Sequence, residues 1–287
     1  MSAERSIAIF SPGLLGGSLA KTVQQRKPGL EIRVWARRAE AVEEVRRDLP
    51  DVFASEDLGE VIRGASLAVL CMPVQHMADI SRRIAACELA EDLIVTDVGS
   101  VKGSIVEELE AIFAVAKVAF IGSHPMAGSQ KTGLTNARSD LFHQAACIVT
   151  PTQNTRQADL DRLKSFWLKL GCRVQEMTPQ KHDHTVARIS HLPHAMAVLT
   201  TLAALSEDAG VLDSSAGGFR DTTRVAGGDP AMWAGIFLQN RAEVISALRD
   251  ASGVMTELLE MLQSMDEEAL RRFLARAKAL RDLLPAV

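Results

Sequence analysis

The sequence predicts an α/β domain built on a parallel sheet, followed by an all-helical domain. In the first half, short apolar runs alternate with glycine or polar turns and with amphipathic stretches that have the period of a helix. This alternation is typical of parallel sheets, because each parallel strand needs a crossover connection. From Pro179 onward the strand-like runs stop and only helical patterns remain. We therefore expect one domain over residues 1–177 and a second over residues 178–287.

Each apolar run of strand length in the first half predicts one strand. The predicted strands are residues 6–10, 31–36, 67–72, 93–97, 118–121, 146–150 and 173–177. A helix is predicted over residues 39–48, and the last helix of the chain is predicted from about Asp266 to Leu284.

The composition indicates a soluble globular protein with a sizeable core. The chain has 287 residues, of which 47% are hydrophobic and 24% charged, and its net charge is −4. This charge offers no general attraction to nucleic acid or to an anionic membrane, so we expect neither as a partner. The sequence shows no apolar run of membrane-spanning length, no signal peptide, and no paired spacing among its four cysteines. We therefore expect a cytoplasmic protein with free thiols.

A glycine-rich turn follows the first predicted strand and opens a helix, with the sequence Ser11-Pro12-Gly13-Leu14-Leu15-Gly16-Gly17-Ser18. Such a turn lets the backbone approach a pyrophosphate at Gly13 and lets helix and strand pack closely at Gly16 or Gly17. The helix N-terminus adds amide donors and a positive dipole. Ser11 stands where the G-x-G-x-x-G pattern has its first glycine, so an ordinary strand-to-helix turn is the alternative.

Several residues are therefore candidates to line a dinucleotide cofactor. They are Ser11, Gly13, Leu14, Leu15 and Gly16 in the turn, with Met72 and Pro73 at the end of the strand 67–72.

The second strand ends in Trp35-Ala36-Arg37-Arg38, where NAD-binding domains carry an acidic residue for the ribose hydroxyls. Ala36 offers those hydroxyls no partner. Arg37 and Arg38 can bind a 2′-phosphate through charge-assisted hydrogen bonds, which favours NADP over NAD. The alternative is that both arginines only begin the solvated helix 39–48.

Two polar loops follow neighbouring strands of the predicted sheet. Asp97-Val98-Gly99-Ser100-Val101-Lys102 follows one strand, and Gly122-Ser123-His124-Pro125-Met126-Ala127-Gly128-Ser129 follows the next. Ligands of open parallel sheets lie at the carboxyl edge of the strands, so Ser100 and His124 can reach one nicotinamide. A neutral His124 can accept a hydroxyl proton. Alternatively, Asp97 or Ser100 only caps the helix that begins near Lys102, and His124 is a turn residue.

The helical half contains the segment Ser190-His191-Leu192-Pro193-His194. Helical spacing places His191 and His194 on neighbouring faces, and Pro193 removes a backbone donor and distorts the helix. Since such a proline is costly, the segment is a candidate functional site.

A second helical constellation runs from Gly217 through Arg220 and Arg224 to Asp229-Pro230 and Trp233. Arginine can bind a carboxylate with two parallel hydrogen bonds, and Trp233 can shield such a pair from water. Asp229 is predicted to cap a helix whose first residue is Pro230. The alternatives are a surface ion pair for Arg220 and a place for Trp233 in a core stripe.

A zinc site formed by His182-Asp183-His184 with His191 and His194 matches known spacings poorly, so we expect no metal. His182 and His184 are instead expected to be exposed near a helix start.

Taken together, these motifs resemble those of the prephenate and arogenate dehydrogenase family of tyrosine biosynthesis. The resemblance rests on the turn from Gly13 to Ser18, the loops 97–102 and 122–129, and the helical segments 190–194 and 218–233. It implies a Rossmann-like N-terminal domain and an all-α C-terminal domain for substrate binding and dimerisation. It also implies oxidative decarboxylation of prephenate to 4-hydroxyphenylpyruvate, or of arogenate to tyrosine, by a homodimer that transfers hydride to NAD or NADP.

The resemblance also implies residue roles. His124 would draw the proton from the ring hydroxyl, Ser100 would orient that hydroxyl and the nicotinamide, and Arg224 would hold a substrate carboxylate. Burial of His124 would favour its neutral, accepting form. The further candidates for the substrate pocket are Arg220, from either subunit, and Ser190, His191, His194, Gln130, Trp233 and Gly217.

Gln130 stands where many members of the family carry an acid. A carboxylate there could attract the amine of arogenate, whereas neutral Gln130 does not repel the keto acid of prephenate, so we favour prephenate. Two alternatives to the family function remain. One is another Rossmann-type hydroxy-acid dehydrogenase with Lys102 or Lys181 as its catalytic lysine, and the other is a non-catalytic NADP-binding dimer.

Overall fold

The computed structural model describes residues 6–128, 131–206 and 209–284. The chain forms two compact units, Met1–Asn240 and Arg241–Val287. The helical segment 178–240 therefore belongs to the same compact unit as the sheets.

The first unit is built on a six-stranded, all-parallel sheet, which confirms the predicted fold class. Its order is β3-β2-β1-β4-β5-β6, the strand order of dinucleotide-binding α/β domains. The strands are β1 (Ser6–Phe10), β2 (Glu31–Trp35), β3 (Phe53–Ser55), β4 (Leu67–Leu70), β5 (Ile94–Asp97) and β6 (Ala119–Phe120).

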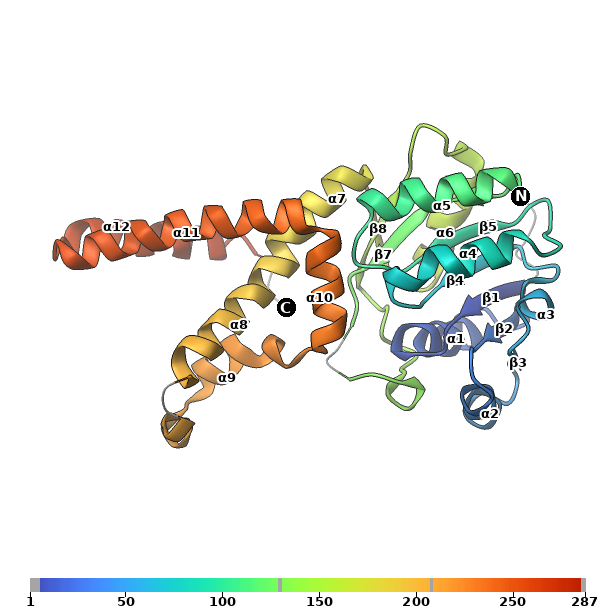
Figure 1. Cartoon of the computed structure of the whole chain (residues 1–287), viewed down its shortest axis with the longest axis horizontal. Helices are drawn as coiled ribbons and strands as arrows, with labels where there is room; N and C mark the ends of the chain where they lie inside the picture. Colours follow the sequence, from blue (N-terminus) through green and yellow to red (C-terminus); the bar gives the residue numbers. More distant parts are fainter. Residues whose placement is uncertain (1–5, 129–130, 207–208, 285–287) are drawn as a thin grey trace. The chain divides into compact units, whose positions relative to one another are not determined.

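Helices cover both faces of this sheet, so its central strands are buried on both sides. One core cluster joins the sheet to α1 (Leu14–Arg26), α2 (Ala39–Asp48) and α6 (Gln157–Lys169). The other core cluster joins it to α3 (Leu58–Ile62), α4 (Met77–Ala85), which follows the 3-10 helix η1 (Val74–His76), and α5 (Gly103–Val115). Figure 1 shows α4 and α5 side by side on their face of the sheet.

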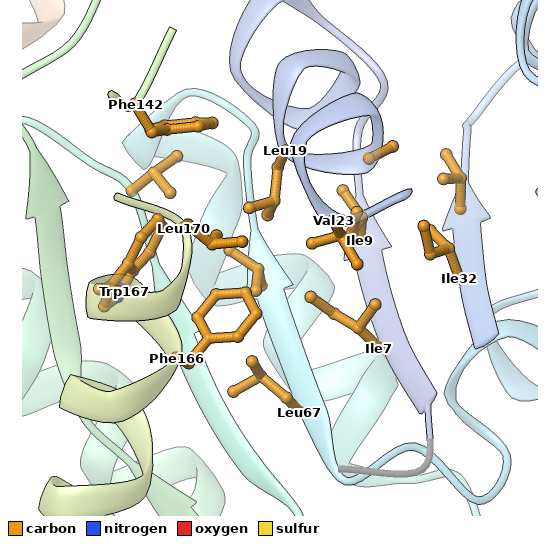
Figure 2. Close-up of a cluster of buried hydrophobic side chains, with 14 of the residues drawn as sticks. Ile7, Ile9, Leu19, Val23, Ile32, Leu67, Phe142, Phe166, Trp167 and Leu170 are labelled. Carbon is orange, nitrogen blue, oxygen red and sulfur yellow. The ribbon is translucent and has the colours of Figure 1, made fainter. Parts of the chain in front are cut away.

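Strand β1 shows how alternate residues serve the two faces. Ile7 and Ile9 point into the cluster with Leu19, Phe166 and Trp167, as Figure 2 shows. Ala8 and Phe10 belong to the opposite cluster. A strand buried on both faces reads as one continuous apolar run, which is why residues 6–10 predicted a central strand.

A second, three-stranded sheet adjoins the first along the chain, in the order β7-β8-β9. It consists of β7 (Gly122–Pro125), β8 (Ala146–Thr150) and β9 (Arg173–Glu176), and β7 runs antiparallel to β8. The prediction that His124 lies in a loop is therefore wrong: His124 lies in β7, opposite Ile148. Gly122 allows this pairing, since a Cβ there would lie 2.5 Å from Thr150 Oγ1.

The helical segment of the first unit begins with α7 (Pro179–Val186), whose N-cap Thr178 accepts a hydrogen bond from the amide of Lys181. A π-helical turn, η3 (Ala187–His191), leads into α8 (Leu192–Leu205). The amide of Leu192 donates to the carbonyl of Ala187, the wider spacing of a π turn. The predicted distortion before Pro193 is thus confirmed.

The same unit ends in short helices. Asp229 caps α10 (Pro230–Gln239) by accepting a hydrogen bond from the amide of Met232 at 2.7 Å, and Pro230 is the first residue of this helix, as predicted. The remaining elements of this unit are η2 (Leu134–Asn136), η4 (Ala209–Ser214), α9 (Gly217–Thr223) and η5 (Arg224–Gly227).

The second unit is a pair of helices in contact with each other, α11 (Arg241–Gln263) and α12 (Glu267–Arg281). Asp266 caps α12 by accepting a hydrogen bond from the amide of Ala269 at 2.9 Å. Within residues 6–128, 131–206 and 209–284, no helix is long and apolar enough to cross a membrane.

Candidate active site

His124 is the buried end of a line of hydrogen-bonded side chains. Its Nδ1 lies 2.9 Å from Nε2 of His182, and Nδ1 of His182 lies 2.8 Å from Oδ1 of Asp183. His182 is completely buried, so its predicted exposure is wrong, whereas His184 is exposed as predicted. The cap at Thr178 starts α7 in a register that turns His182 and Asp183 inward.

Asp183 is held on both of its carboxylate oxygens. Oδ1 accepts the amide of Lys102 at 2.8 Å, and Oδ2 accepts the amide of Gly103 at 2.7 Å. These are the first amides of α5, where an anion is favoured by the helix dipole. The alternative prediction that Asp97 or Ser100 caps this helix is therefore wrong, because its free amides donate to Asp183 instead.

Asp97, at the end of β5, connects the loop that carries Ser100 to strand β7. Its Oδ1 accepts the amide of Ser123 at 3.1 Å, and its Oδ2 accepts the amide of Gly99 at 2.8 Å. Half-buried Ser100 and buried His124 are thus each one residue away from a backbone amide bound to the same carboxylate. Asp97 thus joins the Ser100 loop to β7, the two segments that the sequence predicts to lie together.

Lys102 is completely buried beneath the same loop. Its ammonium donates to Asp97 Oδ2 at 2.5 Å, to the carbonyl of Gly99 at 2.7 Å and to the carbonyl of Val101 at 3.2 Å. These three bonds use every proton of an ammonium group, so Lys102 has none left for a substrate. Lys181 is exposed on α7. Lys102 is therefore not arranged as the catalytic lysine of the alternative hydroxy-acid dehydrogenase.

The buried histidines are held in their neutral form. Burial, followed by the charges of His182, Lys102 and His191, lowers the pKa of His124 well below its ordinary value of 6.5. Burial also lowers the pKa of His182, although the hydrogen bond to Asp183 opposes the shift. Burial lowers the pKa of His191 to about 4. A neutral His124 retains a nitrogen lone pair that can accept a proton.

A second cluster joins the two helical motifs. The rings of His194 and Trp233 stack at 3.5 Å between centroids with 9° between their planes. Trp233 also meets His191 edge-on, with centroids 6.2 Å apart. Only glycine fits at position 228, because a Cβ there would lie 2.3 Å from Nε1 of Trp233. Trp233 also packs against Phe237, the contact expected of the alternative in which Trp233 belongs to a core stripe.

Asn240 links this cluster to the His124 line, a connection that sequence reasoning missed. Its Nδ2 donates to the carbonyl of Asp183 at 2.9 Å and lies 3.2 Å from Nδ1 of His191. A lone asparagine at the end of a helix carries no signal of its own in the sequence. The signal that His182 and Asp183 carry in the sequence is that of a poorly matching metal motif, which does not point to His124.

The glycine-rich turn has the geometry that a dinucleotide needs. A Cβ at Gly16 would lie 2.0 Å from the carbonyl oxygen of Ser11, so helix and turn pack too closely for any side chain there. A Cβ at Gly13 would meet nothing within 4 Å, which leaves the backbone before α1 open to a ligand. Ser11 adopts φ 86°, the left-handed conformation that a glycine usually supplies. These residues fit a pyrophosphate-binding turn.

The other predicted site residues lie on several different elements and differ in their exposure to solvent. Gln130 falls outside the described residues. Arg37 and Arg38 are exposed after β2, buried Met72 and exposed Pro73 follow β4, and Ser190 is half-buried in the π turn. Gly217, Arg220 and Arg224 are exposed on α9 and η5, both of which pack against α8.

Comparison with known proteins identifies the family. Residues 19–176 match the model of the prephenate dehydrogenase nucleotide-binding domain, and residues 178–276 match that of the prephenate dehydrogenase dimerization domain. This chain belongs to the prephenate dehydrogenase family. The predicted resemblance and the predicted Rossmann-like oxidoreductase class are thereby confirmed.

Similar members of the prephenate dehydrogenase family extend over nearly the whole chain. The prephenate dehydrogenase of Bacillus subtilis is 31% identical over 284 residues, which are 98% of this chain and 76% of the relative. The cyclohexadienyl dehydrogenase of Zymomonas mobilis is 29% identical over 276 residues, covering 94% of this chain and 92% of the relative.

Solved structures of the family are similar over the same length. The prephenate dehydrogenase from A. aeolicus, in complex with hydroxyphenyl propionate and NAD+, has 31% identity, a TM-score of 0.88 and 98% coverage of both chains. The arogenate dehydrogenase of Synechocystis has 30% identity and a TM-score of 0.83, covering 96% of this chain and 99% of that chain. The nucleotide-binding match and the NAD+ complex support a nicotinamide cofactor for this member of the family.

Proposed function

We propose that this protein oxidises and decarboxylates prephenate, passing a hydride to a nicotinamide dinucleotide. The observation that carries this proposal is the buried, neutral His124, whose Nδ1 is already bonded to His182 and whose Nε2 remains the nitrogen for a substrate. Its neighbours along the chain are tied to the Ser100 loop through Asp97. Family membership supplies the reaction class, and these residues supply the proton acceptor that the reaction needs.

The proposed reaction releases no net proton, which suits a buried histidine as the proton acceptor. The substrate's hydroxyl-bearing ring carbon loses a hydride, while the hydroxyl proton moves toward Nε2 of His124. The bond to the ring carboxylate then breaks, carbon dioxide leaves, and the electron pair of that bond makes the ring aromatic. The proton returns to the ring oxygen to give a phenol, so no proton has to leave the site. A histidine buried as deeply as His124 can therefore complete each turnover.

The bound nicotinamide would supply the hydride acceptor. Gly13, Gly16 and the N-terminus of α1 would hold the pyrophosphate, with Ser11, Leu14, Leu15, Met72 and Pro73 beside it. Ser100 would orient the substrate hydroxyl, and Arg224 would hold a substrate carboxylate, with Arg220 as the second candidate. His191, His194, Ser190, Gly217 and Trp233 would shape the pocket on the helical side.

We propose NADP as the preferred cofactor. Ala36 is buried at the end of β2, where it gives the ribose hydroxyls of NAD no partner, and Arg37 and Arg38 are exposed next to it. The preference is tested by comparing kcat/KM for the two cofactors, and by Arg38→Ala with Arg47→Ala as control. A large advantage for NAD would overturn it.

We also propose prephenate over arogenate, because Gln130 is neutral. Steady-state kinetics with both substrates test this, and a clear preference for arogenate would refute it. Formation of reduced nicotinamide on adding either substrate or a panel of hydroxy acids separates the proposed activity from both alternatives. Turnover of hydroxy acids alone, or cofactor binding without any turnover, would contradict the proposal.

A homodimer formed through the helical residues 178–287 completes the proposal. The match of residues 178–276 to a dimerization domain supports it, as do the exposed apolar side chains of α11, among them Val254, Met255, Leu259 and Leu262. Sedimentation should give twice the chain mass of 31.0 kDa. A monomer at micromolar concentration would contradict the assignment.

A further inference from the structure

His182 and Asp183 of α7 are buried and polar, and the proposed reaction has so far given neither of them a part. Together they end the hydrogen-bond line that starts at His124. Burying a polar group costs free energy unless the group is hydrogen-bonded, so three buried polar side chains in a line point to a function for the line.

The identity of each donor follows from the fixed end of the line. Asp183 receives two backbone amides, from Lys102 and Gly103, and a carboxylate has only acceptor sites to offer. Nδ1 of His182 lies 2.8 Å from the same carboxylate, so this nitrogen carries the ring proton and donates it. In a neutral imidazole the other nitrogen, Nε2, must then be an acceptor.

The same reasoning extends one ring further. Since Nε2 of His182 accepts, Nδ1 of His124 at 2.9 Å must carry its proton and donate. Nε2 of His124 is then left with a free lone pair. The opposite arrangement would turn a lone pair of His182 toward the carboxylate of Asp183, and this repulsion disfavours it.

We propose that His182 and Asp183 are positioning residues that hold His124 in the tautomer with Nε2 unprotonated. This inference rests on the proposed role of His124 as the proton acceptor. It deepens that role, because a histidine that divides its time between two tautomers presents a correct acceptor only part of the time. The carboxylate acts on the substrate through two intervening rings and touches no reacting atom.

The backbone around Asp183 keeps the line rigid. Its carboxylate caps α5, and its carbonyl accepts Nδ2 of Asn240 at 2.9 Å. The carboxylate therefore cannot rotate away without breaking its bonds to the amides of Lys102 and Gly103, and Asn240 holds the backbone that carries it. The positioning of His124 is thus built into the packing of α5, α7 and α10.

The test is ¹⁵N NMR of the full-length protein with labelled histidines, near neutral pH. The His124 signals are identified as those that vanish in His124→Asn. We expect a proton on Nδ1 and none on Nε2 in the wild type. Asp183→Asn should add a protonated Nε2 population and lower kcat by roughly a hundredfold, while KM and the Kd of the cofactor stay near wild-type values.

A second variant keeps the test decisive if Asp183→Asn does not fold. His182→Gln can place its amide oxygen near the position of Nε2 and accept the His124 proton, so it should keep the tautomer and much of kcat. His182→Leu offers no acceptor and should lose both. His184→Gln, on the exposed side of the same helix, is the matched control and should match the wild type.

A protonated Nε2 of His124 in the wild type would overturn the inference. Equal kcat and equal tautomers in His182→Gln and His182→Leu would also overturn it. The underlying proposal fails separately, through near-normal turnover by His124→Asn, so the two failures are distinguishable.

Discussion

The ammonium of Lys102 lies 2.5 Å from Oδ2 of Asp97, and both side chains are completely shielded from solvent. A buried ion pair is not in itself a large source of stability, but removing one partner strands the other charge. This pair holds the loop that carries Ser100 against β7, so its loss should affect both stability and the site.

Lys102→Met keeps the length of the side chain and removes its charge. We expect it to lower the free energy of unfolding by about 3–5 kcal/mol in a urea titration, because Asp97 loses its buried counter-ion. Lys278→Met is the control, since its pair with Asp282 is exposed and worth about 0–1 kcal/mol. Equal losses in the two variants would contradict this account of Lys102.

Gly228 is in contact with the indole of Trp233. In Gly228→Ala the new Cβ would lie 2.3 Å from Nε1, so Trp233 must move off the ring of His194. We expect kcat/KM to fall roughly tenfold or more, as small displacements of positioning groups often cause, with a change in tryptophan fluorescence. Gly227→Ala meets nothing within 4 Å and should leave both unchanged. The same result for both variants would rule out this role of Trp233.

Ser11 holds a backbone conformation that costs most residues energy. With φ 86°, Ser11→Gly should raise the free energy of unfolding by up to about 1 kcal/mol, since relief of strain exceeds the added chain entropy. Ser104→Gly, at an exposed position of α5, should instead lower it by about 0.5–1 kcal/mol. Thermal or urea unfolding gives both values, and a destabilised Ser11→Gly would disprove the strain.

The depressed pKa of His124 gives a pH dependence with a definite sign. Because burial lowers this pKa well below 6.5, the accepting neutral form persists as the pH falls through 6.5. The acid limb of kcat/KM should therefore contain no transition near 6.5 that His124 causes. An acid limb with an apparent pKa near 6.5 that shifts in Asp183→Asn would show that His124 titrates normally.

Local patterns predicted the elements of this fold well. The sheet, the glycine turn, the cap at Asp229 and the distortion at Pro193 each depend on residues only a few positions apart. The errors arose where a partner lies far along the chain. His124 belongs to a strand because β8 pairs with it. His182 is buried against His124, which lies 58 residues earlier in the chain. The spacing of apolar residues within α7 cannot reveal a partner that lies in another element.

The capping of α5 has the same cause. Sequence neighbours such as Asp97 and Ser100 were the natural candidates, but the cap is Asp183, 80 residues from Gly103. Side chains that connect distant segments are also the ones that orient His124. The parts of the candidate site that sequence reasoning missed are therefore its supporting residues, whereas His124, the proposed proton acceptor, lies in a recognisable motif.

The most direct test of the central claim is the turnover of His124→Asn with prephenate. We expect kcat to fall roughly a hundredfold or more, because the variant has no basic nitrogen to accept the hydroxyl proton, while the Kd of the cofactor stays at the wild-type value. Turnover near the wild-type rate, with cofactor binding intact, would contradict the assignment of His124 as the proton acceptor.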